Sequence, residues 1–112
     1  MREIKAIVRP EHLDDVIRAL HEIPEVPGVI VSRVEGIGRR RPAEGEPAGE
    51  AQFAETAMMK IEIVVSESAA DRVVGAIQKA GWTGRPGDGK IFVLRVEEAV
   101  RIRSGERGES GL

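Results

Sequence analysis

The chain has 112 residues, a net charge of −2 and no cysteine, which fits one domain and excludes disulfides, thiolate metal sites and thiol catalysis. No apolar run approaches the ~20 residues of a transmembrane helix, and no signal peptide is visible, so a cytoplasmic protein is expected. The near balance of charge argues against general binding to nucleic acids. Only three aromatic residues are present, which predicts an aliphatic core and burial at a subunit interface.

The first part of the chain predicts a strand, a helix and a second strand. Apolar residues alternate over 2–9, which is typical of a strand, and Pro10 ends it. Over 12–23 the apolar residues recur at the spacing of an amphipathic helix. Residues 29–37 begin with β-branched side chains and predict the second strand.

The second part repeats this order. Residues 58–65 alternate in the manner of a third strand, and the apolar spacing over 68–80 predicts a second helix. Residues 90–96 predict the fourth strand. A short helical turn is expected at 97–100, and the tail over 104–112 is expected to be flexible.

This order of elements predicts an α+β fold, a ferredoxin-like β-α-β-β-α-β sandwich that forms a single domain over 1–112. Right-handed crossovers would place both helices on one face of a four-stranded sheet. The other face would still carry apolar side chains such as Ile7, which a monomer would leave exposed. We therefore expect the chain to form oligomers.

The segment 38–57 is too long for a hairpin turn, and its Ala, Gly, Pro and Glu content cannot build a core. One interpretation is a mobile linker. The other is an arm that contacts a partner and orders on binding, because long loops in compact domains are usually functional.

Residues 84–90 spell G-x-x-x-x-G-K, the string of a phosphate-binding loop. Ile91 stands where such a loop needs Ser or Thr for Mg²⁺, and a strand follows instead of a helix, so this is not the P-loop of NTPases. Glycine amides can still approach an anion, and Lys90 adds a positive charge. A glycine-rich connection with an ordinary solvated lysine fits these residues equally well.

Two further basic segments could meet an anion. Arg101 and Arg103 alternate after the last strand, so an extended backbone would direct both guanidinium groups to one side. A solvated basic tail is the alternative. The segment GIGRRR at 36–41 combines glycines with three positive charges. Its alternatives are a loop base balanced by nearby glutamates, and nucleic-acid binding, which the lack of stacking aromatics disfavours.

Enzymatic and metal-binding functions find little support in the residues. His12 and His21 are the only histidines, and they are separated by roughly 2.5 helical turns, so they would face opposite sides of the helix. Met58 and Met59 suit strand packing better than a soft-metal site. No Ser-His-Asp set or paired carboxylates are evident, so a non-catalytic protein is expected.

The three basic segments occur together in an order that resembles the PII signal-transduction proteins, which are trimeric cytosolic nucleotide sensors. The resemblance covers nearly the whole chain. It is carried most specifically by TGRPGDGKIFV at 83–93 and VRIRSGERG at 100–108, and also by IKAIVRPEHLDDVIRAL at 4–20 and KIEIVV at 60–65.

The resemblance implies a homotrimer with ATP, ADP or AMP bound in each cleft between subunits. It implies phosphate contacts at 87–90 and, from the neighbouring chain, at two arginines, while a G-x-G-R string lines the cleft and a valine lies beside the purine. The implied nucleotide-binding residues are Gly36, Gly38, Arg39, Val64, Gly87, Asp88, Gly89, Lys90, Arg101 and Arg103. The segment at about 38–57 corresponds to the T-loop, which contacts a membrane transporter or an enzyme. Neither nucleic-acid binding nor membrane insertion is implied.

The chain departs from the nitrogen-sensing members at three points. Arg40 stands in place of the glutamine that holds Mg²⁺ between ATP and 2-oxoglutarate, and Met58 stands in place of a lysine that pairs with 2-oxoglutarate. Residues 36–57 contain neither the tyrosine nor the serine that those members modify. A Mg²⁺-dependent 2-oxoglutarate site is therefore not expected, and the chain resembles a divergent PII-like paralogue. The alternatives are a nitrogen regulator that senses 2-oxoglutarate, and a metal-binding or slowly ATP-hydrolysing trimer.

Overall fold

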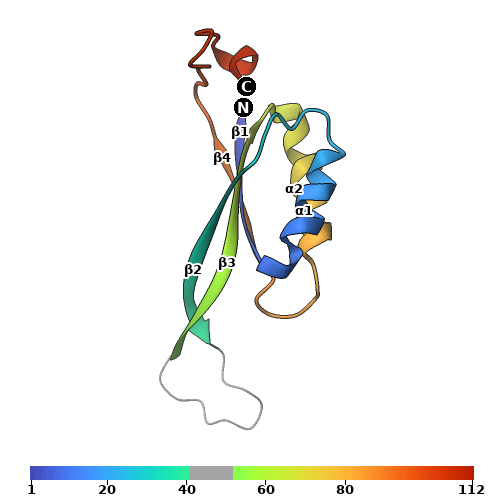
Figure 1. Ribbon diagram of the computed structural model, residues 1–112, viewed down its shortest axis with the longest axis vertical. Coiled ribbons are helices and arrows are strands. Elements are labelled where there is room, and N and C mark those ends of the chain that lie inside the picture. Colours follow the sequence, from blue (N-terminus) through green and yellow to red (C-terminus); the bar gives the residue numbers. More distant parts are fainter. Residues whose placement is uncertain (41–51) are drawn as a thin grey trace.

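The computed structural model of the protein describes residues 1–40 and 52–112. The elements are β1 (Arg2–Val8), η1 (Pro10–His12, a 3₁₀ turn), α1 (Leu13–His21), β2 (Ile30–Arg40), β3 (Gln52–Val65), α2 (Glu67–Gly81), β4 (Gly89–Arg95) and η2 (Gly108–Gly111, a second 3₁₀ turn). The strands pair antiparallel in the order β2-β3-β1-β4. Both helices lie on the same side of the sheet (Figure 1). The predicted ferredoxin-like α+β fold is therefore confirmed.

The core lies between the two helices and one face of the sheet. Alternate residues of β1 and β3 point into it, and each helix contributes its apolar stripe. The residues buried there include Ile4, Ala6, Val8, Val16, Leu20, Ile61, Ile63, Val65, Val73 and Ile77. The buried residues of this core are aliphatic or methionine, and the aromatic side chains of Trp82 and Phe92 are 68% and 49% exposed. The predicted aliphatic packing is therefore confirmed.

The opposite face of the sheet has no helix over it. Phe92 and Leu94 of β4 lie opposite Lys5 and Glu3 of β1 on this open face. They are 49% and 40% exposed, and Ile30 at the start of β2 is 68% exposed. Large apolar side chains exposed together on one sheet face are typical of an interaction surface.

The second and third strands are longer than predicted. β2 reaches Arg40 and β3 begins at Gln52, and the two strands pair as far as these residues. Small residues at 36, 38, 54 and 57 weaken the apolar alternation there, so the pairing of the two strands could not be read from the pattern. The paired strands form an arm that extends beyond the helices (Figure 1). Of the loop predicted at 38–57, the part at 41–51 lies outside the described residues.

The C-terminal segment also differs from the prediction. The helical turn expected at 97–100 does not form, because Val100 pairs with Arg107 in an isolated β-bridge. The amide of Arg101 donates to the Glu106 carbonyl at 2.9 Å. Gly105 and Gly108 have positive φ angles of 74° and 68°, which permit the tight turns. Residues 104–112 therefore contain a defined turn and η2.

Candidate functional site

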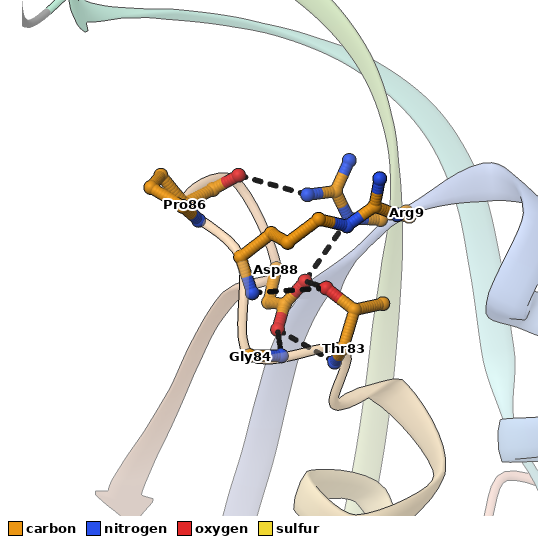
Figure 2. Close-up of polar contacts among 6 residues, drawn as sticks. Arg9, Thr83, Gly84, Pro86 and Asp88 are labelled. Atoms are coloured by element: carbon orange, nitrogen blue, oxygen red, sulfur yellow. Dashed lines mark hydrogen bonds and ion pairs between the residues drawn. The ribbon is translucent and has the colours of Figure 1, made fainter. Parts of the chain in front are cut away.

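The loop that joins α2 to β4 is folded around the carboxylate of Asp88 (Figure 2). The Oδ2 atom accepts hydrogen bonds from the amides of Thr83, at 2.7 Å, and of Gly84, at 3.0 Å. The Oδ1 atom accepts from the Thr83 hydroxyl at 2.5 Å and from Arg9 Nε at 3.1 Å. Asp88, at the end of the loop, therefore accepts from four donors, three at the start of the loop and one in Arg9, which follows β1.

Arg9 also holds the middle of this loop. Its Nη2 donates to the carbonyl oxygen of Pro86 at 2.8 Å, and its side chain is 21% exposed, as is that of Asp88. The Thr83 hydroxyl accepts a further hydrogen bond from the amide of Arg85 at 3.1 Å. The loop is thus fixed by side-chain contacts at its start, middle and end.

The hydrogen bond from the Thr83 hydroxyl is the largest contribution to the lowered pKa of Asp88. With the bonds from the Thr83 amide, Arg9 and the Gly84 amide, it holds the pKa of Asp88 well below its usual range, although desolvation acts in the opposite direction. The carboxylate is ionised, and its negative charge faces a guanidinium and N–H groups. The loop therefore presents no uncompensated carboxylate to an approaching anion.

Glycine is required where this loop enters β4. Gly87 and Gly89 have φ angles of 95° and 103°, a region that glycine adopts without strain. A Cβ atom on Gly89 would lie 1.7 Å from the carbonyl oxygen of Ile7, so no other residue fits beside β1. Across residues 1–40 and 52–112 the amide of Gly87 has no hydrogen-bond partner. A free amide on a glycine turn is the kind of donor that phosphate groups bind.

Lys90 adds a positive charge beside this turn. It is the second residue of β4, its side chain is exposed, and it forms no ion pair with any residue that the structure describes. Together with Asp88 and Gly89 it lines one side of a hollow of about 370 Å³, which α2 and Trp82 close on the other side. We call residues 87–90 the loop half-site.

The predicted residues of the G-x-G-R string lie elsewhere in the chain. Gly36, Gly38 and Arg39 belong to β2, whereas the loop half-site begins β4 at the opposite edge of the sheet. Two strands intervene, so the edges are roughly 14 Å apart at normal strand spacing. One chain does not bring these two groups of residues into contact through the sheet.

Three further predicted residues lie toward the other end of the sheet. Val64 of β3 lines a second hollow, of about 480 Å³, together with Leu112. The guanidinium of Arg101 donates to the main-chain oxygen of Leu112, and Arg103 is exposed nearby in sequence. We call Val64, Arg101 and Arg103 the tail half-site. Figure 1 shows the loop that precedes β4 and the C-terminal segment at opposite ends of β4, which spans roughly 20 Å.

Arg9 and Thr83 are absent from the predicted site residues. Thr83 stands at the start of the TG string, and its five-residue distance from Asp88 is a weak local signal of a turn closed by a side chain. Arg9 is separated from Asp88 by 79 positions, so nothing in its local sequence indicates the contact. The family resemblance implies that Asp88 binds nucleotide, whereas in this chain its carboxylate accepts the hydrogen bonds that close the loop.

No cluster of three or more His, Cys, Asp or Glu side chains that could hold a metal ion is found over 1–40 and 52–112. Met59 lies in the core, and Met58 is buried on the open face beside Gly36. No helix in this part of the chain is long and apolar enough to cross a membrane.

Comparison with known proteins gives consistent matches. The family model described as "Nitrogen regulatory protein P-II" matches residues 1–106. The proteins of that name from Rhodospirillum rubrum and Azospirillum brasilense are each 44% identical over 110 residues, which is 96% of this chain and 96% of theirs.

Solved structures of PII proteins also match this chain. The GlnK–ATP complex of B. subtilis matches with a TM-score of 0.84 and 31% identity, covering 99% of this chain and 96% of that chain. Arabidopsis thaliana PII bound to citrate matches with a TM-score of 0.78 and 40% identity, covering 99% and 91%. The fold and the sequence therefore agree on the same relatives.

Proposed function

Because this chain belongs to the PII family of signal-transduction proteins, we propose that it is a homotrimeric regulator that binds ATP, ADP or AMP between its subunits. PII proteins are regulatory and non-enzymatic, so the nucleotide acts as a signal and not as a substrate. The target would be a membrane transporter or an enzyme, contacted through the segment at about 38–57. We further propose that the chain is a divergent paralogue whose T-loop differs from that of the nitrogen-sensing members.

The observation that carries this proposal is the separation of the loop half-site from the tail half-site. Lys90 lies at the start of β4 and Arg103 comes after its end, with the length of the strand between them, so one chain separates the two charges. A second copy can supply the missing half, as the residues implied by the family resemblance require. The B. subtilis relative was solved as a complex with ATP, which supports ATP as the ligand.

The open face of the sheet supports the trimer. Phe92, Leu94 and Ile30 are exposed apolar side chains on this face, and association would remove them from water. A ring of three copies is a closed assembly in which every copy makes the same contacts. Such a ring would contain three equivalent clefts.

The test combines mass measurement with titration calorimetry. Light scattering on a sizing column should give a trimer. Phe92→Asp should reduce the trimer to monomer, because it places a charge in the proposed interface. Ile37→Asp is the matched control, since Ile37 is 64% exposed but lies on the arm. A monomeric unsubstituted protein would contradict the proposal.

Calorimetry then measures the affinity for the nucleotide. Lys90→Ala and Arg103→Ala should each weaken ATP binding by about tenfold or more, as expected for loss of a charge-assisted hydrogen bond. Lys79→Ala, an exposed lysine on α2, should leave ATP binding unchanged. Absence of heat with ATP, ADP and AMP at protein concentrations well above micromolar would rule out the function.

A second candidate is nitrogen regulation through 2-oxoglutarate, which the names of the curated relatives favour. Two residues weigh against it. Arg40 cannot replace a neutral amide as a metal ligand, and the thioether of Met58, only 8% exposed, offers no charge to a dicarboxylate. We expect 2-oxoglutarate with Mg²⁺ to leave the ATP affinity unchanged. A clear tightening of ATP binding would favour this second candidate.

A further inference from the structure

We propose that Arg9 and Asp88 are positioning residues, whose ion pair holds the 83–88 loop in the shape that turns the loop half-site toward an anion. The proposal rests on the nucleotide-binding function proposed above. It assigns to Asp88 a role inside the loop in place of contact with the ligand, and it adds Arg9 and Thr83 to the residues on which binding depends.

An acidic residue between the two glycines of an anion site needs an explanation. A free carboxylate at position 88 would repel a phosphate bound at Gly87 or Gly89. Instead, both oxygens of Asp88 accept hydrogen bonds, two from backbone amides, one from Thr83 and one from Arg9. The negative charge of Asp88 is therefore neutralised by the donors that organise the loop. The positive electrostatic potential at the ligand would come from Lys90 and the glycine amides.

Arg9 is placed to support the loop and not to contact the ligand. Its Nε and Nη2 donate to Asp88 and to the carbonyl of Pro86, so two of its donors are committed. The Nη2 atom also lies 3.3 Å from the position that a Cβ on Gly87 would occupy. The guanidinium therefore packs directly against the turn whose amide is free, and its removal would take away the side-chain contact to the middle of the loop.

Thr83 connects the start of the loop with its end. Its hydroxyl donates to Asp88 and accepts from the amide of Arg85, so a single oxygen fixes two turns. A loop held in this way before the ligand arrives loses less conformational freedom on binding. The contribution of Arg9, Thr83 and Asp88 to affinity is thus preorganisation of the loop half-site.

The test measures ATP affinity by calorimetry in paired variants. Arg9→Ala, Asp88→Asn and Thr83→Val should each weaken ATP binding by about tenfold, because each breaks a hydrogen bond to a charged group. Thr83→Ser keeps the hydroxyl and should bind ATP nearly as the unsubstituted protein does. Arg9→Lys keeps the charge but reaches one acceptor, and should fall between. The control is Arg18→Ala, which breaks an exposed ion pair with Asp15 on α1 and should have no effect.

A second readout separates positioning from direct contact. Amide hydrogen exchange is measured without nucleotide, at the amides of Thr83 and Gly84 that donate to Asp88. Exchange there should be at least about tenfold faster in Arg9→Ala, Asp88→Asn and Thr83→Val than in the unsubstituted protein. Amides in the middle of β1 should be unchanged, which shows that the fold is intact.

The outcomes distinguish the two proposals. Weaker ATP binding in Arg9→Ala with unchanged exchange at 83 and 84 would mean that Arg9 contacts the ligand, and would overturn this inference. Equal ATP binding in Thr83→Val and Thr83→Ser would also overturn it. Failure of the unsubstituted protein to bind any adenine nucleotide would contradict the proposed function itself, and this inference with it.

Discussion

Gly89 belongs both to the proposed loop half-site and to the sheet. It is the first residue of β4 and pairs with Val8, while the backbone of Ile7 lies too close for any Cβ atom. A substitution here must therefore displace main chain and not a flexible side chain. The same residue serves the fold and the proposed site, and its two roles cannot be separated by mutation.

Gly89→Ala should lower the free energy of unfolding by about 3 kcal/mol or more, because it adds steric overlap with main chain to an unfavourable φ angle. Chemical denaturation followed by circular dichroism measures this change. The control is Gly75→Ala, because Gly75 lies within α2 with no atom near its Cβ position. That variant should instead raise stability by about 0.5–1 kcal/mol, and equal effects of the two variants would contradict the steric explanation.

The ionised state of Asp88 predicts how stability responds to acid. Its pKa is lowered in the folded protein, so the folded state holds this carboxylate deprotonated where the unfolded chain would take up a proton. Its contribution is therefore present above the unfolded pKa, near 4, and is lost as pH falls from there toward the lower folded value. Denaturation midpoints should accordingly be constant near neutrality and fall below about pH 4.

Asp88→Asn should make this decline shallower, since the amide cannot be protonated in this range. The matched control is Asp14→Asn on α1, whose side chain is exposed. The control should keep the full slope of the unsubstituted protein. A slope that is the same in all three proteins would show that Asp88 does not contribute to acid sensitivity.

At the scale of elements, the arm formed by β2 and β3 is the part of the sheet with the least support. Beyond Gly36 and Thr56 the two strands pair only with each other, whereas β1 has a strand on both sides and lies under the helices. Backbone hydrogen bonds outside a core open with little cost. The G-x-G-R string lies within this arm, so a ligand that contacts the string would also act on the arm.

Amide exchange should be fastest over 36–40 and 52–57 and slowest in β1, and ATP should slow it in the arm. Mass spectrometry of peptic fragments measures both differences. At an ATP concentration that just saturates the unsubstituted protein, the change should be much smaller in Lys90→Ala, which weakens ATP binding without altering the arm. Slowing by ATP that is equally large in Lys90→Ala would contradict a link between the loop half-site and the arm.

Element types could be predicted because each apolar period is local. The helical spacing over 68–80 gives α2 almost at its observed position, and the alternation at 58–65 gives the C-terminal part of β3. The extension of β2 and β3 into the arm could not be predicted, because glycine and alanine give no apolar alternation and the strands are specified by pairing with each other. The turn after Val100 could not be predicted either, because the pairing of Val100 with Arg107 depends on the tertiary structure.

The candidate site could be predicted only in part. Glycines and basic residues mark the loop half-site, because a backbone that approaches an anion requires them at adjacent positions. The support from Arg9 could not be foreseen, since it depends on β1 ending beside the loop. Whether Lys90 and Arg103 share a site is likewise a property of the assembly, which no single chain specifies.

At the scale of the whole molecule, the two half-sites at the ends of β4 make the protein suitable for complementation between defective subunits. In the proposed trimer, Lys90→Ala and Arg103→Ala would each damage every cleft of a uniform assembly, but on opposite walls. In any mixed trimer one intact Lys90 would face one intact Arg103. Random mixing of the two variants in equal amounts should therefore restore about a quarter of the ATP sites, whereas mixing two variants of the same half-site should restore none. Two inactive alleles would then make an active sensor when expressed together.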